Sequence, residues 1–458
     1  MNTLILSAIL GVVMMFSGIL FKRYDTVRTV GIVGMLLLFL VSCLELYGIR
    51  IIHYDASAFM EFNSYSMLFN SIAVGVTLLY LLVTARSMQS VGDYYAEYFA
   101  LLFFILCGVV LTTSFTSLLT LFLGIEIISI PLYILTGADK KNLKSNEASL
   151  KYFLMGSFST GVMLLGIALI YGAQGTFSLD KMHFDNNLQS HLQIAGMLIL
   201  LFSLAFKASV APFHFWTPDV YDGAPTVFTS FMATVVKVAV FVGFIRLFEG
   251  AFGVLQPTWQ FWVAFMVALT LFVGNITAVF QQSVKRMLAY SSISHAGFML
   301  LAVLAINDTA REGLLLYGTA YSLATIGVFA VLAKLSDVSY DGFNGLAKHE
   351  PLLALLVTIF LLSMAGIPLT AGFLAKFYML KAVVLTGHNL WLVIFAVIMA
   401  AVSAYYYFRV IQAMYFKDGP SPHIETTMTE KISLIVIAVL TILFGIFPQI
   451  LLNWLHFS

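Results

Sequence analysis

Residues 194–219 form the stretch IAGMLILLFSLAFKASVAPFHFWTPD. Its first half is an apolar run with the composition of a membrane helix. Lys207 follows directly on this run, and Pro212 and Pro218 come next. Because a proline removes a helical N–H donor and clashes with the preceding turn, the stretch predicts a membrane helix that is interrupted beside a lysine.

The rest of the chain is similarly apolar. Of its 458 residues 61% are hydrophobic and 10% charged, whereas soluble globular proteins carry roughly a quarter charged residues. Apolar runs of about 18 or more residues, long enough to cross a bilayer as a helix, recur from end to end. We therefore predict an all-α integral membrane protein of about 14 transmembrane helices. The predicted spans are 4–20, 29–46, 66–84, 98–113, 115–135, 150–171, 194–212, 227–247, 259–280, 287–306, 313–335, 352–385, 391–416 and 432–450.

Basic residues are concentrated in the connections that follow odd-numbered spans. By the positive-inside rule these connections face the cytoplasm, and both termini then face the opposite side. The net charge of +1 gives no indication of a nucleic-acid partner. The odd connections hold Lys22, Arg23, Arg28, Arg86, Lys140, Lys141, Lys144, Lys151, Lys285, Arg286, Lys334, Lys348, Lys417 and Lys431, with Arg409 nearby; the even connections hold Arg50, Lys181, Arg246, Arg311 and Lys381.

Four charged residues lie deep inside predicted spans: Glu126, Lys207, Lys237 and Lys376. A charge at the bilayer centre costs about 2.5–3.5 kcal/mol on insertion scales, so these side chains should face the bundle interior, water or one another. One alternative is a set of static salt bridges between helices. Three amines and one carboxylate cannot all pair one to one, however, and the excess of amines favours a site where an amine is neutral part of the time.

Polar stripes and a second interruption accompany these charges. Glu126, Ser129 and Tyr133 share a helix face, as do Thr226, Ser230, Thr234 and Lys237. Each stripe can line a hydrated passage or simply pack against neighbouring helices. The span 352–385 is too long for one crossing and contains Gly366-Ile367-Pro368. Lys207 precedes its break and Lys376 follows its break, which indicates an inverted repeat with two discontinuous helices around an ion path.

Four motifs carry a resemblance to a known family. They are LGIEIISIPLY (123–133), FKASVAPFHFWTPDVYDGAPT (206–226), QQSVKRMLAYSSISHAG (281–297) and GIPLTAGFLAKFY (366–378). Together they resemble the antiporter-like membrane subunits of proton-translocating NADH:quinone oxidoreductase, respiratory complex I. Within that group the length of the chain and Lys376 are most similar to the type called subunit N. The motifs span roughly residues 97–416 and are specific in combination.

The resemblance implies a proton channel that lacks its own redox centre. Glu126 and Lys207 would form the charge pair of one half channel, Lys237 the central relay, and Lys376 the residue that passes the proton outward. His295 would connect the halves, although a lone membrane histidine can equally be a packed polar residue. Lys285 can serve as an orientation anchor and stays outside the relay set.

The same resemblance implies the setting of the chain. No cofactor is expected in it; NADH, flavin, iron–sulfur clusters and quinone would belong to partner subunits. The expected partners are other membrane-arm subunits and the lipid of a bacterial inner membrane. We expect three N-terminal helices in 1–93, the antiporter-like core in 94–417 and a last helix in 418–458. The alternative function is a subunit of a multi-component sodium/proton antiporter.

Overall fold

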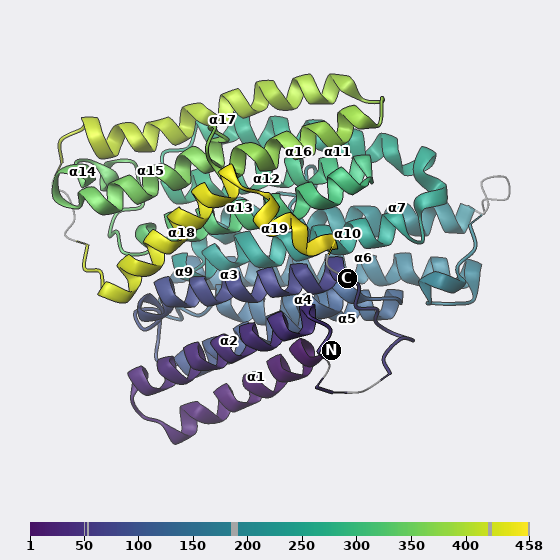
Figure 1. Cartoon of the computed structure of the whole chain (residues 1–458), viewed down its shortest axis with the longest axis horizontal. Coiled ribbons are helices and arrows are strands. Elements are labelled where there is room, and N and C mark those ends of the chain that lie inside the picture. The colour runs from purple at the N-terminus through teal and green to yellow at the C-terminus, as the bar shows by residue number, and fades with distance from the viewer. Residues whose placement is uncertain (50, 53–54, 185–190, 420–423, 457–458) are drawn as a thin grey trace.

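The computed structural model describes residues 1–49, 51–52, 55–184, 191–419 and 424–456, and these residues form a bundle of roughly parallel helices (Figure 1). Within them, 12 helices are long and apolar enough to cross a membrane. Two further apolar segments are each divided by a break, so the prediction of about 14 spans is confirmed. Arg50, which the sequence places in an even connection, lies outside the described residues.

The first third of the chain supplies one edge of the bundle, and three of its helices begin at polar caps. The side chains of Asn63, Ser117 and Asn142 accept hydrogen bonds from N–H groups in the first turns of the three helices they precede. The helices are α1 (Asn2–Leu20), α2 (Tyr24–Leu46), α3 (Ser64–Met88), α4 (Tyr95–Ser114), α5 (Leu118–Thr136) and α6 (Leu143–Gln174), followed by the short turn η1 (Leu179–Lys181).

The middle third forms the interior. Its elements are α7 (His191–Lys207), α8 (Trp216–Gly223), α9 (Thr226–Phe231), the π turn η2 (Met232–Val236), α10 (Lys237–Glu249), η3 (Gly253–Leu255), α11 (Gln256–Val279), α12 (Val284–Ala305) and α13 (Asp308–Leu332). The apolar windows of α12 and α13 are 94% and 100% buried, whereas those of α1 and α2 are 28% buried. Helices α12 and α13 therefore lie at the centre, with neighbours on every side.

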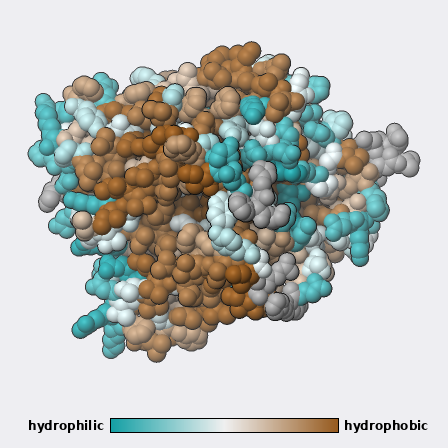
Figure 2. Space-filling model, in the orientation of Figure 1, coloured by the Kyte–Doolittle hydropathy of each residue, from teal (hydrophilic) through white to brown (hydrophobic). Residues whose placement is uncertain are grey.

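The last third closes the bundle opposite α1. It contains η4 (Asp341–Phe343), α14 (Leu346–His349), α15 (Pro351–Ala365), α16 (Ala371–Leu385), α17 (Leu390–Phe416), α18 (Met428–Ile446), α19 (Gln449–Leu452) and η5 (Asn453–His456). Hydrophobic side chains cover most of the middle of the visible face, and hydrophilic ones gather toward its two ends (Figure 2). This distribution fits a protein whose middle lies in lipid.

Both predicted breaks are present, with one correction. Helix α7 ends at Lys207, and the chain turns through Ala208–Phe215, where the Ala211–Pro212 peptide is cis, before α8 begins. Pro218 does not contribute to this break. It lies in the first turn of α8, where the N–H that proline lacks has no helical partner to lose.

The second break separates α15 from α16. Gly366, at φ +86°, ends α15, and Pro368 lies in the short connection between the two helices. Lys376 then lies in the second turn of α16. The two lysines keep the mirror order that the sequence predicted, one directly before its break and the other shortly after.

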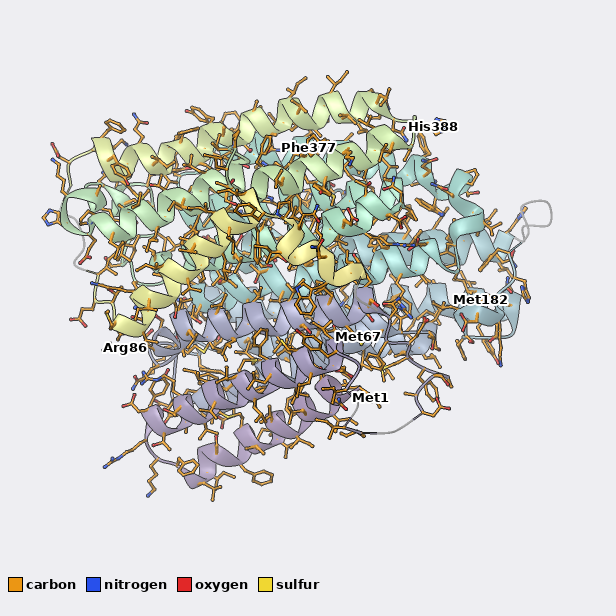
Figure 3. All side chains as sticks on the ribbon, in the orientation of Figure 1. Met1, Met67, Arg86, Met182, Phe377 and His388 are labelled. Carbon is orange, nitrogen blue, oxygen red and sulfur yellow. The ribbon has the colours of Figure 1, made fainter. Side chains whose placement is uncertain are left out.

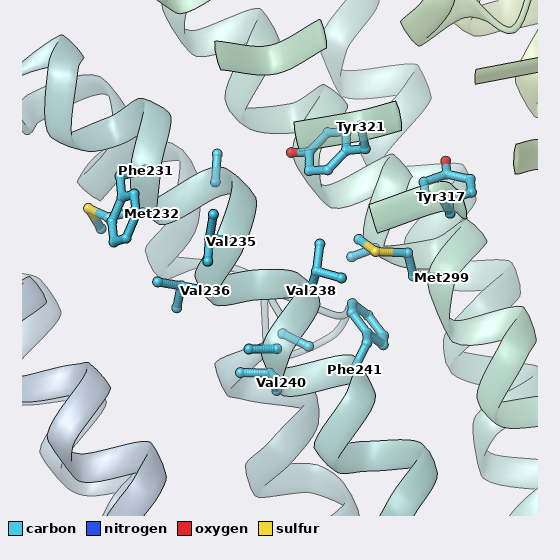
Figure 4. Packing of buried hydrophobic residues seen from close by; sticks show 14 of the residues in the cluster. Phe231, Met232, Val235, Val236, Val238, Val240, Phe241, Met299, Tyr317 and Tyr321 are labelled. Atoms are coloured by element: carbon cyan, nitrogen blue, oxygen red, sulfur yellow. The ribbon is translucent and has the colours of Figure 1, made fainter. Parts of the chain in front are cut away.

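The eighth predicted span is continuous but irregular. It consists of α9, the π turn and α10, with Lys237 as the first residue of α10. Val235, Val236 and Val238 belong to the buried interior, and Figure 4 shows their side chains among those of other core residues. A π turn adds a residue to one turn of a helix and rotates the next turn about the axis, which sets the direction of Lys237.

Candidate functional site

Lys207 is held by hydroxyl groups from two neighbouring helices. Its Nζ donates to Ser129 Oγ at 3.1 Å and to Tyr133 OH at 3.4 Å, both on α5. The Glu126 carboxylate on the same helix approaches to 4.0 Å, and the Lys207 side chain is 7% exposed. The predicted stripe of Glu126, Ser129 and Tyr133 therefore faces Lys207 as a unit.

Thr160 on α6 joins the two charges, and the sequence reasoning missed it. Its hydroxyl donates to Glu126 Oε1 at 2.7 Å and accepts from Lys207 Nζ at 3.1 Å. The contact through this hydroxyl is shorter than the direct 4.0 Å approach of the two charges. Helix α6 has no charged residue near Thr160, and hydroxyl residues are common in membrane helices. The sequence therefore carries no specific signal for Thr160.

Lys237 is buried, at 2% exposure, and is bonded to α12. Its Nζ donates to the carbonyl oxygen of Ser292 at 3.2 Å and also to the Ser292 hydroxyl. The ring of Tyr221 from α8 lies 5.5 Å from the same Nζ. An aromatic ring face attracts a cation at this range, so Tyr221 favours the protonated amine.

His295 lies on α12, within electrostatic reach of both Lys237 and Lys376. Its Nδ1 is 2.7 Å from Tyr317 OH, and its Nε2 is 3.1 Å from Tyr407 OH. Both ring nitrogens are therefore hydrogen-bonded to hydroxyls, which can donate or accept. The imidazole can thus exchange the roles of its two nitrogens without losing a partner.

Lys376 is bound by the broken end of α15. Its Nζ donates to the carbonyl oxygens of Met364 and Ala365, at 3.0 and 2.8 Å. Carbonyl groups at a helix C-terminus have no helical partner and carry the negative end of the helix dipole, so they favour a cation there. The break thus supplies the ligands of the lysine, as predicted for discontinuous helices.

A small cavity lies beside Lys376 and His295. It offers about 10 Å³ to a water-sized sphere, about the room needed for one water. Tyr317, Tyr321 and Ser363 complete the polar part of its lining. The cavity places a wettable space between the histidine and the last lysine.

Static ion pairing does not account for these lysines. Among the described residues, the pairs within 4.0 Å include Glu126–Lys207 but neither Lys237 nor Lys376. Those two amines bind neutral hydroxyl and carbonyl oxygens instead. In the same part of the chain, no group of three or more His, Cys, Asp or Glu side chains could hold a metal ion.

Comparison with known proteins decides the family. The profile described as "NADH:quinone oxidoreductase/Mrp antiporter, TM" matches residues 115–403. A protein of Cytophaga hutchinsonii named NADH-quinone oxidoreductase subunit N is 38% identical over an alignment of 466 positions, which covers 99% of each chain. The chain belongs to the subunit N family. The subunit N of Flavobacterium psychrophilum is 36% identical over an alignment of 468 positions, which covers 99% of this chain and 100% of its own.

Solved structures agree with the subunit N assignment. A chain of respiratory complex I from Thermus thermophilus with bound aureothin is 31% identical, with a TM-score of 0.85 over 98% of each chain. A chain of an archaeal membrane-bound sulfane sulfur reductase is 25% identical, with a TM-score of 0.87 over 99% of this chain and 96% of its own. A chain of the Mrp complex from Dietzia sp., 17% identical with a TM-score of 0.86 over 99% of this chain and 96% of its own, shares the fold. The predictions of an antiporter-like fold and of a resemblance to subunit N are confirmed.

Proposed function

We propose that this chain is a proton-translocating membrane-arm subunit of an NADH:quinone oxidoreductase. Its subunit N relatives and the complex I chain of the same fold support this assignment. Electron transfer from NADH through flavin and iron–sulfur clusters to quinone takes place in partner subunits. The chain acts in a bacterial inner membrane, with its lysine-rich connections in the cytoplasm and both termini on the other side.

The observation that carries the proposal is the series of titratable groups within the helix bundle, most of them buried and bonded to neutral oxygens. Glu126 and Lys207 share the Thr160 hydroxyl, Lys237 binds Ser292, His295 is within electrostatic reach of Lys237 and Lys376, and Lys376 binds the end of α15. We assign these five groups as the proton relay, in that order. All of them lie in the segment 94–417, which we assign as the channel core; the family match at 115–403 supports that boundary.

The mechanism follows from electrostatics. A nearby Glu126 carboxylate stabilises the Lys207 ammonium, so separation of the pair lets Lys207 release its proton toward Lys237. A proton arriving at Lys237 repels the proton on Lys376, because like charges interact strongly where water is scarce. His295 and the Tyr317 and Tyr407 hydroxyls bonded to it transfer the proton between these two lysines. The driving energy comes from the redox subunits.

Lys237→Gln tests the proposal most directly, because every transfer in the scheme passes this amine. Glutamine keeps a donor for the Ser292 carbonyl but cannot carry the proton. We expect pumping per NADH to fall at least about tenfold in vesicles containing the reconstituted complex, since a positioned proton-transfer group is worth about 10²–10⁴ in rate. Glu126→Gln should also lower pumping, with the complex still assembled.

Lys348→Gln is the control, because this exposed lysine lies at the surface against Asp418. It should pump like the unaltered complex. Normal pumping by an assembled Lys237→Gln complex would overturn the relay assignment. The family description also covers Mrp antiporters, so pumping is measured with and without sodium; a strict sodium requirement without redox coupling would favour the antiporter alternative.

A further inference from the structure

Lys285, at the start of α12, is a buried amine outside the relay described above. The residue is 6% exposed, although the sequence placed it near a helix end as an orientation anchor. Its Nζ donates to the carbonyl oxygens of Asp222 and Ala224, at 2.8 and 2.6 Å. These carbonyls lie at the C-terminal end of α8, the short helix that follows the first break.

The environment of Lys285 matches that of Lys376. Each amine donates to two carbonyls at the end of a half helix, and neither takes part in an ion pair within 4.0 Å among the described residues. The cation fits the negative end of the helix in both places. The two lysines are therefore bound in the same way, each at the C-terminal end of a half helix that borders a break.

A polar cavity of about 260 Å³ opens beside Lys285, enough for several waters. Asp139, Lys144 and Asp222 contribute charged groups to its lining, and Thr226 lines it as well. The lining comes from several of the odd, lysine-rich connections, so the cavity lies on that side of the bundle. Lys285 is thus next to space that water from that side can fill.

A polar stripe continues inward from this cavity to Lys237. It begins with Thr226 in the cavity lining and passes Ser230 and Thr234 on the way. Ser230 is fully buried, and its hydroxyl has no hydrogen-bond partner among the described residues. A buried hydroxyl without a partner loses the hydrogen bonds that it makes to water, so Ser230 is left able to bond to a water molecule on the stripe.

One face of helix α12 also connects the cavity at Lys285 with Lys237. Lys285 and Ser292 are seven residues apart and share a helix face, about 10 Å apart along the axis. Ser292 binds Lys237, and His295 follows within one turn on nearly the same face. The face of α12 therefore connects Lys285 to the centre of the relay without passing α5, α6 or α7.

We propose that Lys285 is the entry residue of a second access route, through which protons from the lysine-rich side reach Lys237 without passing Glu126 and Lys207. This inference rests on the proposed proton-translocating function. In each transfer the Lys285 ammonium gives one proton, along the hydroxyls of the stripe, to the neutral amine of Lys237. Lys285 then takes one proton from water in the cavity, and no electron moves.

Two substitutions separate a route from a helix cap. Lys285→Gln keeps an N–H donor for the α8 carbonyls, and Lys285→Arg keeps both the donors and the charge, but neither side chain releases a proton near neutral pH. If Lys285 only caps α8, both variants should keep its function. If Lys285 carries protons, both variants should lose it. We expect each variant to lower pumping per NADH by about twofold, as when one of two independent routes closes.

The double variant Glu126→Gln/Lys285→Gln should lose nearly all pumping, because both routes are then closed. Lys285 variants that pump normally while Lys237→Gln does not would overturn the second route and leave the proposed function intact. A double variant no worse than Glu126→Gln alone would also overturn it. Normal pumping by Lys237→Gln would instead overturn the proposed function itself, and Lys348→Gln serves again as the control.

Thiol labelling tests the cavity independently of pumping. Thr226→Cys lies in the cavity lining, whereas Thr229→Cys, one turn on, is fully buried and outside it. With Cys43 and Cys107 changed to alanine, a small charged methanethiosulfonate added from the lysine-rich side should label Thr226→Cys at least about tenfold faster than Thr229→Cys, since water-filled space admits the reagent and packed core does not. Equal protection of both would show a closed cavity and overturn the route.

Discussion

The hydroxyl of Thr160 determines how the first two charges of the relay meet. Lys207 and Glu126 approach to 4.0 Å, but Thr160 bonds to both, at 3.1 and 2.7 Å. Charge-assisted hydrogen bonds of this kind are about twice as strong as neutral ones. A pair held through a hydroxyl can separate by rotation of one side chain, without leaving either charge bare.

Thr160→Val tests this role with almost no change in shape. Valine cannot donate a hydrogen bond to Glu126 or accept one from Lys207. A hydrogen bond to a charged group contributes about 1.5–3 kcal/mol. We expect pumping to fall by about twofold while the complex still assembles, measured as acidification per NADH in vesicles, because the second route to Lys237 stays open. Thr160→Ser keeps the hydroxyl and should retain most activity. Equal pumping by the valine and serine variants would contradict the bridge.

The sequence could predict some of these residues and not others. Glu126, Lys207, Lys237 and Lys376 stand out because a charge in an apolar run needs an explanation. Thr160 does not, since a membrane hydroxyl has many ordinary roles. The sequence favours an anchor role for Lys285 because its position near a helix end resembles that of an interfacial lysine; only the packing of α8 over it shows that it is buried.

At the scale of elements, the contact between α15 and α16 holds Lys376 in place. Gly372 packs against the end of α15 so closely that a Cβ on it would lie 1.8 Å from the Ser363 carbonyl oxygen. The obstacle is backbone, which cannot rotate away. This glycine therefore sets how near Lys376 comes to the carbonyls of Met364 and Ala365.

Gly372→Ala should push α16 away from α15 and weaken the binding of Lys376. Overpacking of this kind typically costs about 1–3 kcal/mol, so we expect a lower thermal midpoint and less assembled complex in membranes. Gly161→Ala is the matched control, because no atom lies within 4 Å of its added Cβ. It should be neutral or stabilising, since alanine favours a helix interior over glycine. Equal stability of the two variants would contradict the close contact.

The breaks show what local sequence can decide. Pro212 and the Gly366-Ile367-Pro368 segment predicted both interruptions, because proline and glycine act on the backbone directly. The π turn at Met232–Val236 was not predicted, since its residues also occur in regular helices.

Across the whole molecule, ion pairs connect helices at both ends. On the lysine-rich side Asp219 of α8 binds Lys151 of α6 at 3.1 Å and Arg286 of α12 at 2.9 Å. At the other end Arg246 of α10 binds Glu61 at 2.9 Å. Exposed pairs contribute little individually, about 0–1 kcal/mol. These ion pairs lie at the ends of the bundle, whereas the relay lysines in the interior bind mainly neutral oxygens.

The two ends of the bundle also determine its orientation, which labelling can test. Arg86 and His388 lie at opposite ends (Figure 3), and Lys141 lies in the same lysine-rich set of connections as Arg86. With Cys43 and Cys107 changed to alanine, His388→Cys should react with an impermeant thiol reagent on intact spheroplasts, whereas Lys141→Cys should react only after the membrane is opened. Both positions are exposed in the structure, so the difference reports sidedness, as the positive-inside rule requires. The reverse pattern would place the lysine-rich connections outside and invert the direction of the proposed relay.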